Sequence, residues 1–437
     1  MAQSVEKTTI RKIYVRVLPL LFAAYFVCYL DRINVGFAAL TMNKELGFTA
    51  TVFSLGATAF FWGNCVFEIP SNIVLEKIGA RIWIARIMVT WGVFSTATAF
   101  VTGATSFGIV RFLLGVCEAG FFPGMILYFT YWFPSRYRGR VVGWFMTAIP
   151  VSIALGAPIS TALLELDGVL GLSGWRWMFI GEGIPATLLG FFVLTLLSDR
   201  PEKASWLAPE QREWLIKELR AERSAIEGVR IYSVLQSLLN LRVLALAVIY
   251  LGIGTASVGL VIFLPQMIKQ LGVSNMMTGF ATSVPYVAGT IGMIVCGYVT
   301  DHMHERRWNL FFTCLAAAIG LLIAALLSGS FWALAGLSLA TIGFYGMKTS
   351  FWPLPSTFLS GTAAAAAIAG INSFGNLGGL IGPNAVAWFR DHTGTFATGL
   401  YFLSCCALIS AIVTQVAVRS PLREAEAPGL GVAARRA

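Results

Sequence analysis

The sequence predicts an all-α membrane protein with twelve transmembrane helices, and three observations support this fold class. First, 57% of the 437 residues are hydrophobic and only 12% are charged, whereas soluble domains carry about 25% charged residues. Second, apolar segments of about 20 residues, the length that crosses a bilayer, occur twelve times along the chain. Third, one long polar stretch divides these segments into two sets of six.

The twelve predicted spans and the polar stretch define three regions of the chain. The spans lie at roughly 14–38, 51–72, 82–103, 107–131, 141–164, 178–198, 242–268, 277–300, 308–328, 331–355, 364–389 and 395–418. We therefore predict an N-terminal six-helix bundle (1–198), a cytoplasmic linker (199–240), and a C-terminal six-helix bundle with a cytoplasmic tail (241–437). Apolar residues recur at helical spacing in the linker and predict an amphipathic surface helix, namely Leu207, Trp214, Leu215 and Leu219.

The distribution of basic residues predicts the orientation. If the N-terminus is cytoplasmic, 24 of the 31 Lys and Arg residues lie on the cytoplasmic side and four lie outside. The remaining three, Arg32, Arg111 and Lys348, lie within spans. Basic loops stay in the cytoplasm, so we expect both termini inside, in a bacterial inner membrane. The net charge of +10 then reflects topology and gives no support for a nucleic-acid partner.

The N-terminal segment argues against a cleaved signal peptide, and the cysteines and histidines argue against a metal site. The first apolar run continues past Asp31 without a small-residue cleavage site, so we expect a retained span instead of a removed signal peptide. Nearly all of the seven cysteines lie in apolar runs without metal-ligand spacing, and the three histidines are dispersed in loops. We therefore expect no metal site and no cofactor.

The segment RFLLGVCEAGFFPG (111–124) carries two charges inside an apolar span. Even on a lenient scale, a charge at the centre of the bilayer costs about 2.5–3.5 kcal/mol. Arg111, Gly115 and Glu118 fall on one helix face, with the two charges roughly 10 Å apart along the axis. This pattern predicts a cation and a titratable acid facing one cavity. The alternative is a buried ion pair that fixes helix packing. The glycines around Pro123 are expected to permit a bend or a close helix approach.

A short charged pattern occurs once in each half of the chain. Glu76 and Lys77 precede Arg81 after the second span, and Asp301 precedes Arg306 after the eighth. In both places an acid is followed five residues later by Arg, 225 positions apart. An acid at a helix end and a base in a short turn can hold neighbouring helices in one conformational state. The alternative is two unrelated, solvated turns.

These features resemble the major facilitator superfamily, whose fold joins two six-helix bundles by pseudo-two-fold symmetry. Its loop pattern Gly-x-x-x-Asp-Arg-x-Gly-Arg is degraded here, with Asn72 at the glycine position and Glu76-Lys77 replacing Asp-Arg. A closer resemblance is to the anion:cation symporter family, nearest to bacterial permeases for tartrate, other sugar acids and aromatic acids. It rests on YLDRINVGFA (29–38), FEIPSNIVLEKIGAR (67–81), RFLLGVCEAGFFPG with YWFPSRYRGR (111–140), GWRWMFIGEGIPA (174–186), and FWPLPSTFLSGTAAAAAIAGINSFGNLGGLIGP (351–383).

The resemblance implies symport of a small organic anion, driven by protons or sodium, through alternating access. It assigns Arg32 and Arg111 to the substrate carboxylate, Tyr29 to a substrate hydrogen bond, and Asp31 and Glu118 to protons. Helix geometry agrees in part, because Tyr29 and Arg32 share a face, whereas Asp31 lies about 100° from Arg32 and should face a neighbouring helix. An adjacent Arg lowers the pKa of a buried acid, so substrate arrival beside the Arg can change proton affinity.

Other polar residues within the spans have two interpretations each. Asn372 and Asn376 are one turn apart, and each can bind a substrate hydroxyl or a neighbouring helix. The Lys348 side chain can contact substrate or extend to the cytoplasmic edge of the membrane. Of these two, we favour extension to the cytoplasmic edge. Glu68 and Glu182 lie near span ends, where structural pairing or capping is expected.

The leading hypothesis is a proton-coupled symporter for an organic anion such as tartrate or another sugar acid. Alternatives are an organic anion exchanger or a sodium-coupled symporter. An exchanger needs no titratable acid, so Asp31 and Glu118 argue against it. A membrane-embedded enzyme is a remote third, because no nucleophile–base pair or phosphate loop lies in a span. The expected partners are the substrate anion, the coupling ion and the lipid bilayer, and we expect the protein to function as a monomer.

Overall fold

The computed structural model of the chain describes residues 2–227, 240–302, 306–354 and 361–417. Every regular element in these ranges is helical. The first group comprises α1 (Ala2–Leu46), α2 (Ala50–Ile78), α3 (Ala80–Ala97), α4 (Ala104–Glu118), α5 (Phe121–Trp132), α6 (Ser135–Met146), α7 (Ala148–Leu164) and α8 (Gly174–Leu196). After α9 (Pro209–Glu227), the second group comprises α11 (Leu241–Lys269), α12 (Asn275–His302), α13 (Arg306–Leu326), α14 (Ala333–Phe351), α16 (Gly361–Thr393) and α17 (Ala397–Ala417). Three short 3₁₀ turns occupy Thr98–Phe100, Val169–Gly171 and Pro201–Lys203.

The described residues confirm the helices expected at all twelve predicted spans. The fourth span consists of α4 and α5, and the fifth consists of α6 and α7. Within the ranges that the structure describes, ten helical stretches are long and apolar enough to cross a membrane by length and composition alone. The other two predicted spans correspond to α14 and α16.

The break between α4 and α5 lies at a glycine, as the glycine-rich sequence suggested. Gly120 has φ +83°, a left-handed conformation that favours glycine. A Cβ at this position would also lie 2.5 Å from Ser71 Oγ. The Ser71 hydroxyl donates a 2.6 Å hydrogen bond to the carbonyl of Ala119, so α2 satisfies a backbone acceptor at the break.

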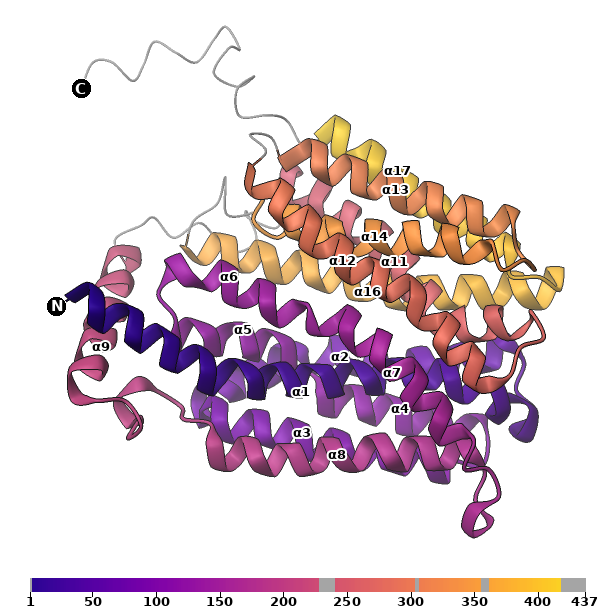
Figure 1. Ribbon diagram of the computed structural model, residues 1–437, viewed down its shortest axis with the longest axis horizontal. Helices are drawn as coiled ribbons and strands as arrows, with labels where there is room; N and C mark the ends of the chain where they lie inside the picture. The colour runs from indigo at the N-terminus through magenta and orange to yellow at the C-terminus, as the bar shows by residue number, and fades with distance from the viewer. Residues whose placement is uncertain (1, 228–239, 303–305, 355–360, 418–437) are drawn as a thin grey trace, which may run out of the picture.

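Helices α1–α8 pack with one another and form the N-terminal bundle, and the C-terminal bundle consists of α11, α12, α13, α14, α16 and α17 (Figure 1). The two bundles lie side by side with their helices running roughly along the same direction, and α9 lies with the N-terminus at one end of the molecule. We call this the α9 end. The bundles meet where α2 packs on α16, α7 on α12, and α1 on α11. Residues on these helices can therefore face each other across the interface.

The linker contains the predicted amphipathic helix, α9, which packs against α1. Leu215 is fully buried. Ion pairs fix the polar side of α9 to the N-terminal bundle: Arg138 with Glu222 at 2.9 Å, and Arg136 with Glu218 at 3.0 Å. Pairs this exposed contribute little individually, so the apolar face provides most of the attachment.

At the end opposite α9, contacts between α2 and α16 join the two bundles. The carboxylate of Asp391 accepts hydrogen bonds from the backbone N–H groups of Ala50 (3.2 Å) and Thr51 (2.8 Å). These are unsatisfied donors in the first turn of α2, and a negative charge is favourable at a helix N-terminus. Further along the same two helices, the Asn384 amide of α16 donates to the Thr58 hydroxyl of α2 at 3.0 Å. The bundles are thus tied together at this end.

Candidate functional site

A cavity lies in the middle of the molecule, where the two bundles meet. It has two adjoining parts that share six lining residues: Tyr29, Arg32, Ile149, Tyr250, Lys348 and Asn376. These residues come from α1, α7, α11, α14 and α16, so both bundles contribute to one central space. Arg111 lines one part, and Glu68 and Glu118 line the other. Most of the polar residues predicted for the site are therefore brought together.

Glu118 forms an ion pair with Arg32 of α1. Arg32 Nε lies 2.6 Å from Glu118 Oε1, and the Cys28 thiol donates to the same oxygen at 3.2 Å. The Glu118 side chain is fully buried, whereas 26% of the Arg32 side chain is exposed to the cavity. The arginine therefore has one side on the carboxylate and another on the cavity, where a second anion can reach it.

Arg111 lies on the same helix as Glu118 but does not pair with it. Arg111 is 3% exposed and lies against the Phe60 ring, 5.3 Å from its centroid. Within the described part of the chain, its Nε and Nη1 atoms have no hydrogen-bond partner. Unsatisfied buried donors are costly, and an arginine fork matches a carboxylate in two-point geometry. Arg111 is thus suited to hold a carboxylate that enters the cavity.

Asp31 faces a neighbouring helix, as its angular offset from Arg32 predicted. It is 1% exposed and does not line the cavity. Its Oδ1 atom accepts a 3.1 Å hydrogen bond from Asn34 and another from the Ser95 hydroxyl of α3. Asp31 is therefore a buried acid behind the cavity wall.

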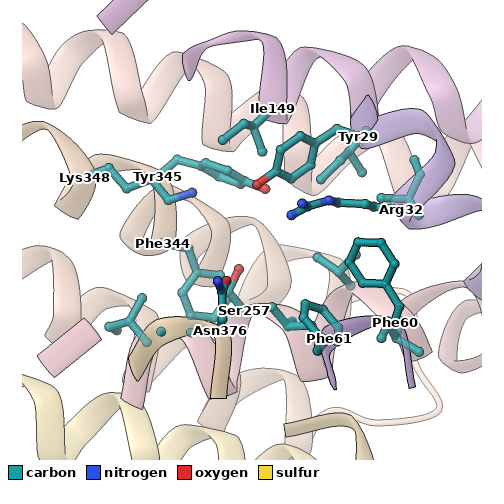
Figure 2. A pocket seen from close by; sticks show the side chains of 18 of the residues that line it. Tyr29, Arg32, Phe60, Phe61, Ile149, Ser257, Phe344, Tyr345, Lys348 and Asn376 are labelled. Atoms are coloured by element: carbon teal, nitrogen blue, oxygen red, sulfur yellow. The ribbon is translucent and has the colours of Figure 1, made fainter. Parts of the chain in front are cut away.

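The favoured interpretation of Lys348 as a residue that extends to the cytoplasmic edge is wrong. Its side chain lines both parts of the cavity, and its Nζ atom lies 4.9 Å from the centroid of the Tyr345 ring. Figure 2 shows Lys348 from α14 and Arg32 from α1 pointing into the same space from opposite sides. No ion pair to Lys348 occurs among the described residues. Lys348 lies in the last turn of α14, and its amine points into the cavity between the bundles.

Tyr29 lies on the cavity wall beside Arg32 (Figure 2). The Arg32 guanidinium carbon is 5.2 Å from the centroid of its ring, and Tyr25 packs edge-on against it at 5.1 Å. These contacts fix the ring and leave Tyr29 lining both parts of the cavity.

The asparagines of α16 bind a residue of the opposite bundle. Asn372 Nδ2 donates to Glu68 Oε1 and Asn376 Nδ2 donates to Glu68 Oε2, both at 3.2 Å. The expected structural pairing of Glu68 is therefore present, and all three residues also line the cavity. Sequence reasoning missed that Glu68 faces the cavity, although an acid within an apolar span was a signal. Glu182 instead accepts a 2.6 Å bond from Ser160, away from the cavity.

The charged loop of the first half forms contacts within its own bundle. Arg81 Nε donates to the Leu194 carbonyl at 2.6 Å, and its backbone N–H donates to Asp199 at 2.8 Å. Glu76 and Lys77 are exposed, and no described hydrogen bond or ion pair joins Glu76 to Arg81. The acid that meets Arg81 is thus Asp199, three residues beyond the last residue of α8.

The second half of the repeated pattern lies partly outside the described residues. The side chain of Asp301 and residues 303–305 are outside them, and Arg306 is the first residue of α13. The predicted role of Asp301 and Arg306 in holding neighbouring helices in one conformational state therefore stays a prediction.

Comparisons with known proteins identify the family. The model of the Major Facilitator Superfamily matches residues 21–383. The chain belongs to the major facilitator superfamily. A protein of Agrobacterium vitis described as "Putative tartrate transporter" is 50% identical over 420 residues, covering 96% of this chain and 97% of the relative. A "Quinolone resistance transporter" of Acinetobacter baumannii is 40% identical over 412 residues, covering 94% and 95%.

A solved structure agrees with this assignment at the level of the fold. The crystal structure of a D-xylose–proton symporter matches with a TM-score of 0.72 and 16% identity, covering 92% of this chain and 97% of that one. The superfamily member described here is a multi-pass membrane transporter and not an enzyme. The fold class and family predicted from the sequence are confirmed.

Proposed function

We propose that this transporter couples the entry of protons to the uptake of a small organic anion, such as tartrate or another sugar acid, by alternating access. The observation that carries the proposal is the Arg32–Glu118 ion pair in a cavity that also holds Arg111. A titratable acid shares its arginine with the space where a substrate carboxylate would sit. The Glu118 carboxylate and a substrate carboxylate therefore compete for one guanidinium.

The coupling follows from the charges of this pair. While Glu118 is ionised, its carboxylate pairs with the Arg32 guanidinium. A substrate carboxylate would then have to displace the buried Glu118 carboxylate from Arg32. When Glu118 takes up a proton, Arg32 becomes free to bind the carboxylate together with Arg111. Proton and anion thus favour each other's binding, and each supplies part of the free energy that selects the loaded state. Asp31 is a second candidate acid, because it is buried within the same bundle and directly precedes Arg32 in α1.

The substrate class is supported by the cations of the cavity and by the relatives. Arg32, Arg111 and Lys348 come from both bundles, so a small anion can contact both at once. The description of the Agrobacterium vitis relative names tartrate as its substrate. The 24-to-4 distribution of basic residues supports cytoplasmic termini. The ties at the end opposite α9 are consistent with a cavity closed toward the outside.

The test is uptake by purified protein in liposomes. An inward proton gradient should drive accumulation of labelled tartrate or another sugar acid, and a proton ionophore should abolish it. Accumulation that follows a sodium gradient and ignores the proton gradient would overturn proton coupling. Exchange without uphill accumulation under either gradient would instead identify an anion exchanger. Including a quinolone in the same assay tests a second candidate cargo, which the description of the Acinetobacter baumannii relative favours.

A further inference from the structure

Glu68 occupies an unusual place for a carboxylate. It projects from α2 into the interface between the bundles, where it is 9% exposed and lines the cavity beside Arg32, Glu118 and Lys348. Each of its oxygens accepts one 3.2 Å hydrogen bond, from Asn372 and Asn376. An ionised carboxylate offers about four acceptor sites. About two of these sites are left for a ligand in the cavity.

The charge of Glu68 is not needed to join the two helices. The same helices, α2 and α16, are also joined by the uncharged Asn384–Thr58 hydrogen bond at 3.0 Å. Neither Asn384 nor Thr58 lines the two parts of the central cavity. Burying a charge costs more than burying a neutral polar group. The carboxylate of Glu68 at the cavity wall therefore indicates a role that an uncharged hydrogen-bonding pair, such as Asn384 and Thr58, would not perform.

The charges around the cavity indicate what Glu68 would contact. Arg111 and Lys348 are cations available to a substrate carboxylate, and Arg32 is shared with Glu118. Among the described residues, Glu68 makes no ion pair within 4.0 Å. Its negative charge would repel a substrate carboxylate and strengthen a hydrogen bond from a hydroxyl group. The two asparagines hold the carboxylate in position for such a bond.

We infer that Glu68 is a specificity-determining residue that accepts hydrogen bonds from the hydroxyl groups of the substrate. The cavity then binds an acid by its carboxylate at the arginines and by its hydroxyls at Glu68, and it disfavours acids of the same length without hydroxyls. Asn372 and Asn376 act as positioning residues for Glu68. This inference rests on the proposed function and adds the substrate feature that distinguishes one organic anion from another.

The test uses three four-carbon diacids that differ in hydroxyl number: tartrate with two, malate with one and succinate with none. In proteoliposomes, each acid competes for counterflow of a labelled sugar acid, and the apparent affinity of each is measured. A hydrogen bond to a charged group changes affinity about tenfold or more. The protein should therefore prefer tartrate over succinate by at least tenfold. Glu68→Gln should reduce this ratio by at least tenfold, with succinate binding retained or improved.

Matched variants separate selectivity from a merely structural role. Thr58→Val removes the neighbouring bond between the same helices and should leave the tartrate-to-succinate ratio unchanged. Glu68→Asp keeps the charge but shortens the side chain, so it should retain a preference for hydroxylated acids at reduced affinity. It serves as the second readout if Glu68→Gln does not fold.

The possible outcomes distinguish this inference from the proposed function. If Glu68→Gln lowers transport of all three acids by one factor and keeps their ratio, Glu68 only joins the bundles and the inference is overturned. Equal affinity of the unmodified protein for tartrate and succinate also overturns it, while symport stands. If the unmodified protein takes up neither these acids nor gluconate, the proposed function itself fails.

Discussion

A methyl group at Gly115 would collide with the backbone of α2. An ideal Cβ there lies 2.0 Å from the Phe60 carbonyl oxygen and 3.0 Å from the Asn64 nitrogen, whereas ordinary contact begins at 3.4 Å. These contact atoms belong to the backbone of α2 and cannot move aside as a side chain can. Gly115→Ala must therefore push α4 from α2 by roughly 1.4 Å, the difference between 3.4 and 2.0 Å. Overpacking of this kind costs about 1–3 kcal/mol. Since Arg111 and Glu118 flank Gly115 by about one turn on each side, both should shift.

The assay compares Gly115→Ala with Gly108→Ala on the same helix. A Cβ at Gly108 meets no atom within 4 Å, so that variant should be neutral or slightly stabilising, because alanine favours helix over glycine. Thermal unfolding in detergent, followed by tryptophan fluorescence, should show a lower midpoint for Gly115→Ala alone. Its affinity for the organic anion should fall as well. Equal midpoints and affinities in the two variants would refute the close approach of α2 and α4.

Three further predictions concern binding, orientation and pH. Arg111→Lys keeps the charge but loses the planar fork, so anion binding measured by competition should weaken at least tenfold, and unchanged affinity would exclude Arg111 as the carboxylate site. In a background without native cysteines, a cysteine at Lys44 should label from outside the cell and one at Lys217 should not; external labelling at Lys217 would reverse the topology. Partial burial raises the pKa of Asp391, but hydrogen bonds from Thr51 and its neighbour outweigh this and lower it overall. A lowered pKa means that the stabilisation is complete above the ordinary value of about 3.9 and is lost only as pH falls through the native value. Asp391→Asn should therefore leave the shape of the uptake profile between about pH 5 and 8 unchanged, and a changed shape would contradict this assignment.

Much of the fold could be predicted because the bilayer imposes a simple rule on sequence. Apolar length revealed the twelve spans, and amphipathic spacing revealed α9. The extent of α1, Ala2–Leu46, was not visible, because its polar first turns lie beyond the apolar run and pack against α9. The bend in the fourth span was expected, but only tertiary contact with Ser71 places it at Gly120.

The residues of the cavity were partly predictable, whereas their partners were not. The cost of a charge inside the bilayer singled out Arg32, Arg111 and Glu118 from sequence alone. Their pairing depends on which helices pack together, so the choice of Arg32 as the partner of Glu118 required the structure. The same reason explains Lys348. Its place near a span end suggested an outward course, but α14 packs on α12 and α13 so that the Lys348 side chain lines the cavity.

The central claim is that Glu118 couples protons to transport, and Glu118→Gln tests it most directly. Glutamine keeps the size and hydrogen-bonding capacity of the side chain but cannot gain or lose a proton. Counterflow needs only the loaded carrier to reorient, so the variant should still exchange labelled anion across liposome membranes. Accumulation against a gradient, driven by an inward proton gradient, should be lost. If Glu118→Gln keeps full pH-dependent accumulation, Glu118 is not the coupling acid, and the account is contradicted.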